Sequence, residues 1–337
     1  PMRPSSSFLW FIPALIIALT ISLVAASGGN WSAKAASDAP LAGRSFALGQ
    51  IEHRITMAES QITDIRPGLE KSIIWAGAPH QRTRYAIVYI HGFSASKEEL
   101  RPVPDRIAAA LGANIFYTRL TGHGRTAEAM REASVAAWMQ DLAEAFQIGT
   151  MIGDKVILIS CSTGGTLVAA GIVRGIFSEQ LFSTVFFAPN FGVQDRMAPL
   201  LTWPLARYWA PLIGGEMQTN TPRNQLHARY WTTSYPTISL IPMMQLIDMV
   251  DDAELRTSTV PGLFYFSPDD KVVDPQKTEN FIARWRGPKE IMRVNGNDSE
   301  DELNHLITGQ VVSPSQVKRA ADTVINWHHR ISHPAAN

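Results

Sequence analysis

Residues 157–165 read ILISCSTGG, and they place four hydroxyl or thiol side chains next to one another, at positions 160–163. The run KVILIS at 155–160 is short, apolar and rich in β-branched residues, which predicts a strand. The residues that follow, GGTLVAAG at 164–171, have the spacing of a helix. A direct turn from this strand into this helix would hold the residue between them in a strained and exposed conformation.

Such a turn is the nucleophile elbow, usually written G-x-S-x-G, and it needs small residues two positions before and two positions after its centre. With Ser162 at the centre, Ser160 and Gly164 occupy these positions. With Cys161 at the centre, β-branched residues would occupy both of these positions. With Ser160 at the centre, a leucine would occupy the first of them. Thr163 passes this test, but its own β-branched side chain suits a strained turn badly. We therefore predict Ser162 as the nucleophile, although Ser160 stands where the pattern has glycine and the string alone also fits a structural turn.

The rest of the chain repeats the alternation of strand and helix. The predicted strands are KSIIWA at 71–76, YAIVYI at 85–90, NIFYTRL at 114–120, KVILIS at 155–160, STVFFAP at 183–189, GLFYFS at 262–267 and EIMRV at 290–294. The predicted helices are EELRPVPDRIAAAL at 98–111, VAAWMQDLAEAFQIG at 135–149, GGTLVAAGIVRGIF at 164–177 and SPSQVKRAADTVINWHHRI at 313–331. Strands that are apolar throughout are typical of a sheet covered on both faces. This pattern predicts an α/β fold with a mostly parallel, doubly wound sheet.

One stretch interrupts the alternation, from Phe191 to about Glu254, and it is rich in proline, tryptophan and methionine. We interpret it as an inserted helical cap. The predicted organisation is an N-terminal segment and linker at 1–45, a first part of the core at 46–190, the cap at 191–258 and a second part of the core at 259–337.

The N-terminal region contains FLWFIPALIIALTISLVAA at 8–26, nineteen residues without a charge. This length approaches the roughly 20 residues that cross a bilayer. The segment is therefore either an uncleaved membrane anchor or a signal peptide, with SAKA at 32–35 as a small-residue cleavage site. The Gly-, Ser- and Ala-rich stretch at 26–43 follows it as a linker. Both alternatives predict that the remainder works on the extracytoplasmic side, anchored to the membrane or released as a periplasmic or secreted protein.

Composition excludes other classes of function. Lys plus Arg equals Asp plus Glu, at 30 each in 337 residues, and basic runs with interleaved aromatic residues are absent, which argues against nucleic-acid binding. The single cysteine, Cys161, excludes an intrachain disulfide framework and a cysteine-rich zinc site. We expect Cys161 to point away from the nucleophile as a small buried apolar residue. The oligomeric state is left open.

A serine nucleophile needs a base, and the base needs an acid that orients it. In folds that carry the serine on a nucleophile elbow, the chain order of the three is Ser, Asp or Glu, His. Asp270 lies in PDDKVVDP at 268–275, directly after a predicted strand, and we predict it as the orienting acid. Asp269 and Asp274 are the alternative candidates for the acid. The non-catalytic interpretation is that these carboxylates only form a polar turn. His305 is predicted as the base because it lies in a polar loop beyond the last strand. The remaining downstream histidines are in or after the terminal helix, at His328, His329 and His333.

The oxyanion of the reaction needs hydrogen-bond donors. YIHGFSAS at 89–96 follows a predicted strand, and the backbone N–H of Phe93, together with that of Thr163, is our predicted oxyanion hole. His91 and His123, the latter in RLTGHG at 119–124, are interpreted as structural. A metal site at these histidines is the rival interpretation, but no carboxylate stands at ligand spacing. We therefore expect no metal and no cofactor.

Taken in order, IHGFSAS, RLTGHG, the Trp138 and Asp141 of W-x-x-D, ISCSTGG, SPDDKVVDP and the Asn-His pair that ends at His305 resemble the α/β-hydrolase superfamily, specifically its carboxylesterase and monoacylglycerol-lipase-like members. The resemblance covers about residues 70–332. It implies the α/β-hydrolase fold and a serine hydrolase, whose nucleophile, acid and base fall on Ser162, Asp270 and His305.

The expected substrate is a small-molecule acyl ester. Aromatic and thioether side chains of the cap are candidates for an apolar acyl-binding cleft, with packing inside the cap as the alternative interpretation, namely Trp203, Trp209, Trp231, Met243, Met244 and Met249. With the N-terminal segment, they favour a lipophilic carboxylic ester, such as an acylglycerol or lysolipid. Arg207, Arg223 and Arg229 are candidates for contact with an anionic head group, and solvated surface charge is the alternative interpretation. Two alternatives remain open at this point: an amidase or aminopeptidase with the same triad, and a catalytically silent binding protein with this fold.

Overall fold

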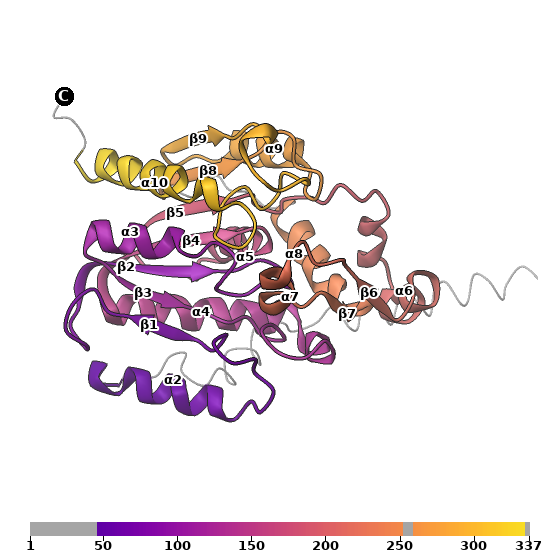
Figure 1. The fold of residues 1–337 in the computed structure, drawn as a ribbon, viewed down its shortest axis with the longest axis horizontal. Helices are drawn as coiled ribbons and strands as arrows, with labels where there is room; N and C mark the ends of the chain where they lie inside the picture. Colours follow the sequence, from indigo (N-terminus) through magenta and orange to yellow (C-terminus); the bar gives the residue numbers. More distant parts are fainter. Residues whose placement is uncertain (1–45, 252–258, 334–337) are drawn as a thin grey trace, which may run out of the picture. The chain divides into compact units, whose positions relative to one another are not determined.

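The computed structural model describes residues 46–251 and 259–333, and a seven-stranded sheet forms its centre (Figure 1). The strands lie in the order β1-β3-β2-β4-β5-β8-β9. Only β1 is antiparallel to its neighbour, and the other pairs are parallel. Their bounds are β1 Ser72–Ile74, β2 Thr83–Ile90, β3 Asn114–Tyr117, β4 Gly153–Cys161, β5 Leu181–Phe187, β8 Gly262–Phe266 and β9 Lys289–Arg293. All seven predicted strands are confirmed.

The two faces of the sheet are both buried. Side chains alternate between these faces along each strand, so one strand contributes to two core clusters. In β2, Ala86, Val88 and Ile90 belong to one core cluster, and Ile87 and Tyr89 belong to the other. The first cluster includes residues of α2 Ile51–Ser60, α4 Val135–Ile152, α5 Thr163–Val173, α8 Leu240–Asp251 and α9 Pro275–Arg284. The second includes residues of α3 Val103–Leu111 and α10 Val317–Ser332. The predicted doubly wound α/β fold is therefore confirmed.

Two helices of the core were not predicted, α2 and α9. The start of α9 nevertheless carries a readable signal, because the Asp274 side chain accepts a hydrogen bond from the amide of Gln276 and Pro275 is the first helical residue. Short 3₁₀ helices complete the core at η2 Leu48–Gln50, η3 Glu128–Glu132, η7 Gly296–Asp298 and η8 Pro314–Gln316.

The chain between β5 and β8 leaves the sheet, and it contains the stretch that we interpret as a cap. Its elements are η4 Ala198–Thr202, α6 Ala206–Gly214, β6 Met217–Thr219, α7 Gln225–Tyr230, β7 Ser234–Pro236, η5 Thr237–Ser239 and α8. The antiparallel pair β6 and β7 was not predicted, since three-residue strands are too short to show an alternation. The segment is thus not purely helical.

The predicted anchor or signal segment, 8–26, lies outside the described residues. Within the described residues, the longest apolar helices all fall short of what a bilayer crossing requires.

The parallel strands bring four predicted site residues to one edge of the sheet. Ser162 follows β4, and Asp270 follows β8. His305 follows β9, and Phe93 follows β2. The carboxyl ends of parallel strands share an edge, which is where α/β folds present functional groups.

Candidate active site

The strand-to-helix turn after β4 has the strained geometry that the sequence predicts. Ser162 has φ 49° and ψ −122°, and α5 begins at the next residue. A Cβ atom at Gly164 would lie 2.3 Å from the carbonyl oxygen of Ile90, so only glycine fits there. Ser160, the departure from the pattern, is accommodated because its hydroxyl donates a 3.1 Å hydrogen bond to the carbonyl of Val185 on β5.

We predict that Gly164→Ala destabilises the protein by at least about 1–3 kcal/mol, the usual cost of an overpacked core site. The neighbouring atoms are the backbone carbonyls of Ile90 and His91 and cannot rotate away. Thermal unfolding measures the effect. Gly77→Ala is the matched control, because a Cβ there meets nothing within 4 Å. An unchanged melting temperature for Gly164→Ala would show that the turn relaxes freely.

The three residues predicted as nucleophile, base and acid form one hydrogen-bonded chain. His305 Nε2 lies 3.0 Å from Ser162 Oγ, and His305 Nδ1 lies 2.7 Å from Asp270 Oδ2. All three side chains are buried. The other oxygen of Asp270 accepts hydrogen bonds from the amides of Val272 and Val273, at 2.8 and 2.9 Å. Asp270 therefore accepts the Nδ1 proton of His305, which leaves Nε2 free to accept the serine proton.

The alternative acids lie elsewhere. Asp269 accepts a hydrogen bond from the amide of Gly296, and Asp274 caps α9. His328 contacts Ser332 on α10 rather than this chain of residues.

The charge state of His305 depends on its surroundings. Burial lowers its pKa, but the negative charge and hydrogen bond of Asp270 raise it. The carboxyl groups of Glu99 and Asp301 raise it further, and the net pKa lies above the ordinary value of 6.5.

This shift predicts the pH dependence of the reaction. A base must be neutral to accept a proton, so activity is absent below the pKa of His305 and appears as pH rises through it. We expect the acidic limb of kcat/KM to have its midpoint above pH 6.5, measured on a chromogenic ester in buffers of constant ionic strength. A midpoint at or below the ordinary histidine value would contradict this environment for His305.

The two predicted oxyanion donors belong to segments that meet at Ser162. Thr163 is the first residue of α5, where an amide has no partner within the helix. The loop that carries Phe93 packs directly on the turn, since a Cβ at Gly92 would lie 3.0 Å from the Cβ of Ser162. Phe93 and Thr163 both line the cleft described below.

A buried carboxyl that the sequence analysis missed, Glu99, supports this loop. Its Oε2 accepts hydrogen bonds from the amide of Gly92 and the hydroxyl of Tyr89, each at 2.8 Å. Burial raises the pKa of Glu99. Its neighbour Cys161 is also buried and packs in the second core cluster, and burial raises the pKa of the thiol well above its ordinary value. A buried thiol of this kind is a poor nucleophile.

His91 links two of the surrounding loops. Its Nε2 accepts a hydrogen bond from the amide of Leu120, and its Nδ1 bonds the carbonyl of Gly92. Burial lowers its pKa to about 4, so the ring is neutral. His123 packs beside it, with ring centroids 5.0 Å apart. No group of three or more His, Cys, Asp or Glu side chains in 46–251 or 259–333 is arranged to hold a metal.

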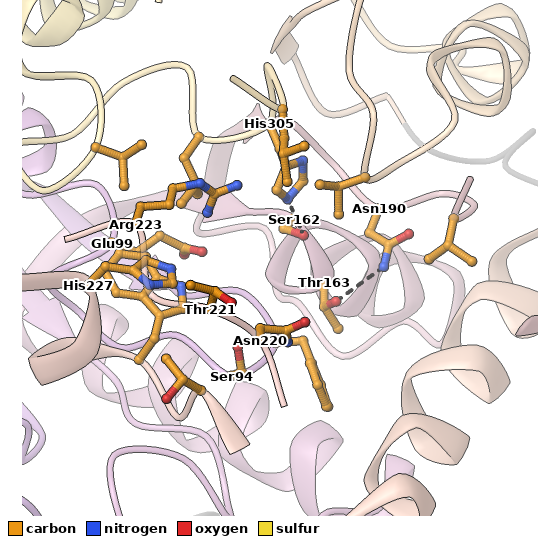
Figure 2. Close-up of a pocket in the computed structure, with 18 of the residues that line it drawn as sticks. Ser94, Glu99, Ser162, Thr163, Asn190, Asn220, Thr221, Arg223, His227 and His305 are labelled. Atoms are coloured by element: carbon orange, nitrogen blue, oxygen red, sulfur yellow. Dashed lines mark hydrogen bonds between the residues drawn. The ribbon is translucent and has the colours of Figure 1, made fainter. Parts of the chain in front are cut away.

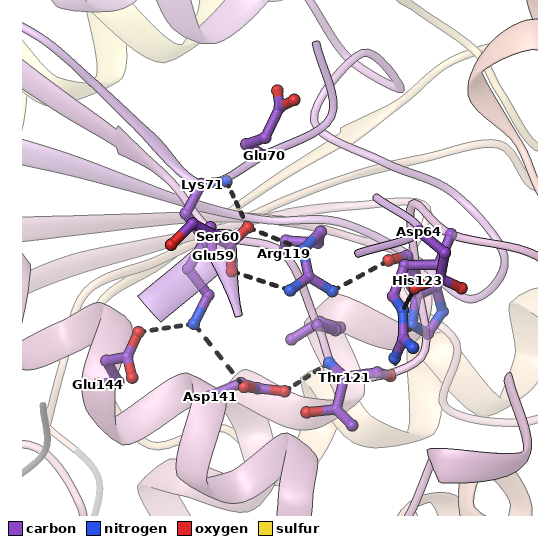
Figure 3. A network of polar contacts seen from close by, with 12 residues as sticks. Glu59, Ser60, Asp64, Glu70, Lys71, Arg119, Thr121, His123, Asp141 and Glu144 are labelled. Carbon is purple, nitrogen blue, oxygen red and sulfur yellow. Dashed lines mark hydrogen bonds and ion pairs between the residues drawn. The ribbon is translucent and has the colours of Figure 1, made fainter. Parts of the chain in front are cut away.

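The W-x-x-D pair holds the next loop in place, and Figure 3 shows its Asp141 beside Thr121. Asp141 accepts a 2.6 Å hydrogen bond from the amide of Thr121, and Trp138 Nε1 donates to the carbonyl of the same residue. Beside them, the buried pair Arg119 and Glu59 lies at 2.8 Å (Figure 3).

The hydrogen-bonded chain opens into a cleft of about 700 Å³ (Figure 2). Polar residues of the cap segment gather on one side of Ser162, and they are Asn220, Thr221, Arg223 and His227 (Figure 2). Apolar residues also line the cleft, among them Val193, Leu240, Met243 and Val272.

The predicted apolar lining is therefore wrong in part. Of the six aromatic and thioether candidates, only Trp231 and Met243 line the cleft. Trp203 is 62% exposed, and Met244 is buried in the core of the sheet. Of the three arginines, Arg223 alone lines the cleft, and it pairs with Asp301 at 2.8 Å. Hydrophobicity alone does not tell which face of a short helix turns inward.

Comparison with known proteins bears on the fold. A search of curated proteins found no significant match. Among solved structures, a metagenome-derived lipolytic enzyme from the work on LipS and LipT superposes with a TM-score of 0.62 at 17% identity, covering 79% of this chain and 99% of that one. The monoglyceride lipase of Saccharomyces cerevisiae gives 0.60 at 14% identity, covering 78% and 91%. The monoacylglycerol lipase of Paleococcus ferrophilus gives 0.58 at 14%, covering 79% and 99%. At these identities the likeness concerns the fold.

The family model described as the alpha/beta hydrolase family matches residues 87–306, which is more than half of the chain. The protein therefore belongs to the alpha/beta hydrolase family.

Proposed function

We propose that this protein is a serine hydrolase that cleaves carboxylic esters through an acyl-enzyme intermediate. The observation that carries the proposal is the chain from Ser162 Oγ to His305 and from His305 to Asp270, at 3.0 and 2.7 Å, at the base of a cleft. A buried imidazole between a hydroxyl and a carboxylate is the arrangement that activates a serine.

In the acylation step, His305 Nε2 accepts the proton of Ser162 as the serine oxygen bonds to the carbonyl carbon of the ester. The carbonyl oxygen becomes negative, and the amides of Phe93 and Thr163 donate hydrogen bonds to it. The carbon–oxygen bond to the alcohol then breaks, and His305 returns its proton to the leaving oxygen. The imidazolium that forms in between is stabilised by the carboxylate of Asp270.

In the deacylation step, water takes the place of the alcohol. His305 accepts a proton from the water as its oxygen bonds to the acyl carbon. The bond to Ser162 breaks, the serine oxygen regains a proton from His305, and a carboxylic acid is released. The residues of this chain supply every group that these steps require.

The lining of the cleft suggests the class of ester. Its apolar residues suit an acyl chain, whereas the cluster around Asn220 and Thr221 suits a polar alcohol part. Arg223 is already paired with Asp301, and Glu300 and Glu302 also line the cleft. This balance of charge disfavours the anionic head group considered from the sequence. We therefore propose a small ester with a lipophilic acyl part and an uncharged polar part, bound beneath the cap segment, which the structure describes over residues 191–251.

A fluorophosphonate probe tests the reaction class, because it phosphonylates an activated serine. We expect mass spectrometry of the treated, folded protein to locate the label on Ser162, and hydrolysis of p-nitrophenyl esters to exceed that of matched p-nitroanilides. An unlabelled serine in folded protein would favour a silent binding protein. Equal rates on esters and anilides would favour an amidase.

The extracytoplasmic location, by anchor or by export, stays a prediction. Fractionation of cells that express the full chain, with N-terminal sequencing of the product, would distinguish an intact segment at 8–26 from a cleaved one.

A further inference from the structure

The loop that carries His305 lies in a segment without regular secondary structure. Residues 299–308 form bends and turns after η7, so neither a helix nor a strand holds the imidazole in place. Some other interaction must do so, because a catalytic base has to stay within hydrogen-bond distance of its serine.

The carboxylate of Asp301 is that interaction. Its Oδ2 accepts hydrogen bonds from the amides of His305 and Leu306, at 3.1 and 2.7 Å. Its Oδ1 accepts a third, from the amide of Leu303, at 3.2 Å. The side chain is completely buried, at 0% exposure. A buried carboxylate that collects three amides of one short loop determines the path of that loop.

A cation from the cap completes the arrangement. Arg223, between β6 and α7, approaches with two nitrogens: Nε lies 2.8 Å from Oδ1, and an Nη lies 3.3 Å from Oδ2. Arg223 also lines the cleft, where its side chain keeps 27% exposure. The same guanidinium therefore contacts the space for the substrate and the carboxylate that shapes the loop of His305.

We propose that Asp301 is a positioning residue for His305, and that Arg223 makes this positioning depend on the cap. The inference rests on the proposed function, since it assigns a part in the same reaction. A cap segment displaced from the cleft would withdraw Arg223 and leave the buried carboxylate unpaired, which is an unfavourable state. The base is then correctly placed only when the cap segment covers the cleft.

The test compares Asp301→Asn, Arg223→Gln and the double variant, with the fluorophosphonate labelling rate of Ser162 and the kcat for p-nitrophenyl acetate as readouts. Both rates are taken on the pH plateau, above the acidic limb. We expect Asp301→Asn to lower them about 10²-fold, as small displacements of reacting groups do. Arg223→Gln should lower them about tenfold, within the usual range of coupling between sites. The double variant should match Asp301→Asn alone, because Arg223 acts through Asp301.

The pH profile separates this role from a merely structural one. Three carboxyl groups affect the charge of His305 directly, and they are Asp270 after β8, Glu99 after β2 and Asp301 on the loop of His305 itself. Arg223 faces Asp301 from the cap. Glu300 and Glu302 also line the cleft. Asp301→Asn removes a negative charge, so the acidic limb should move to lower pH. Arg223→Gln removes a positive charge, so the limb should move to higher pH. Arg223→Lys keeps the charge without the planar fork, so the plateau rates should fall while the limb stays in place.

Arg293→Gln is the matched control, because it breaks a similar two-nitrogen contact, to Glu279, at 2.6 and 2.8 Å and outside the cleft lining. We expect its labelling rate and its kcat to equal those of wild type. The proposal would be overturned if both Arg223 variants had the plateau rates of wild type. It would also be overturned if the effects of Arg223→Gln and Asp301→Asn multiplied independently in the double variant. If Asp301→Asn lowers the melting temperature strongly, the two arginine variants decide the question. Absence of labelling in wild type would instead reject the proposed function.

Discussion

Ser162→Ala is expected to lower kcat for ester hydrolysis by about 10⁶-fold, which is the scale of losing the nucleophile of a serine triad. The variant should fold normally, because the hydroxyl contributes one hydrogen bond, to His305, and Ala keeps the Cβ that packs beside Gly92. The measurement is kcat on a p-nitrophenyl ester at a pH above the acidic limb, with unfolding temperature as a check.

Cys161→Ala is the matched control for that experiment, since it removes the neighbouring nucleophile from the same turn. Its thiol is buried and packs in the core cluster on the other side of the strand, so the variant should retain most of the activity. A large loss in Cys161→Ala together with residual activity in Ser162→Ala would reverse the assignment of the nucleophile.

The second large effect is expected for Asp270→Asn, with a loss of about 10⁴-fold in kcat. The carboxylate accepts the Nδ1 proton of His305 at 2.7 Å, whereas an amide nitrogen at that position would stabilise the wrong tautomer. Loss of the negative charge should also lower the pKa of His305 and move the acidic limb to lower pH. Steady-state kinetics across the pH range measures both effects.

Asp269→Asn provides the comparison, because it changes the adjacent carboxylate, which bonds the amide of Gly296 and does not contact His305. We expect near wild-type rates. If the two variants lose activity equally, the orienting role does not belong to Asp270 alone.

Much of the fold could be predicted because the core strands are local patterns. A run such as YAIVYI is apolar on both faces wherever it occurs, and a sheet covered on both faces is the arrangement that buries it. The pair β6 and β7 could not be predicted in this way. Each strand has three residues, and their pairing depends on contacts between positions 217–219 and 234–236.

The residues of the candidate site show the same difference between local sequence patterns and contacts of distant segments. Ser162, Asp270 and His305 were found because each follows a recognisable strand and their chain order is diagnostic. Glu99 and Asp301 were missed because they stand within acidic, polar strings, KEEL and SEDEL, that look the same as solvated surface. Only their burial and their bonds to backbone amides distinguish them from their exposed neighbours.

The amino-acid sequence by itself determined the alternation of strands and helices, the sharp turn at residue 162 and the order of the three side chains that form the hydrogen-bonded chain. These depend on steric demands and periodicities that act over a few residues. The tertiary structure alone decided which carboxylates are buried, which cap residues face the cleft and that Arg223 reaches Asp301 across 78 positions of the chain. Burial and pairing of charges arise between segments distant in sequence, so no local pattern records them.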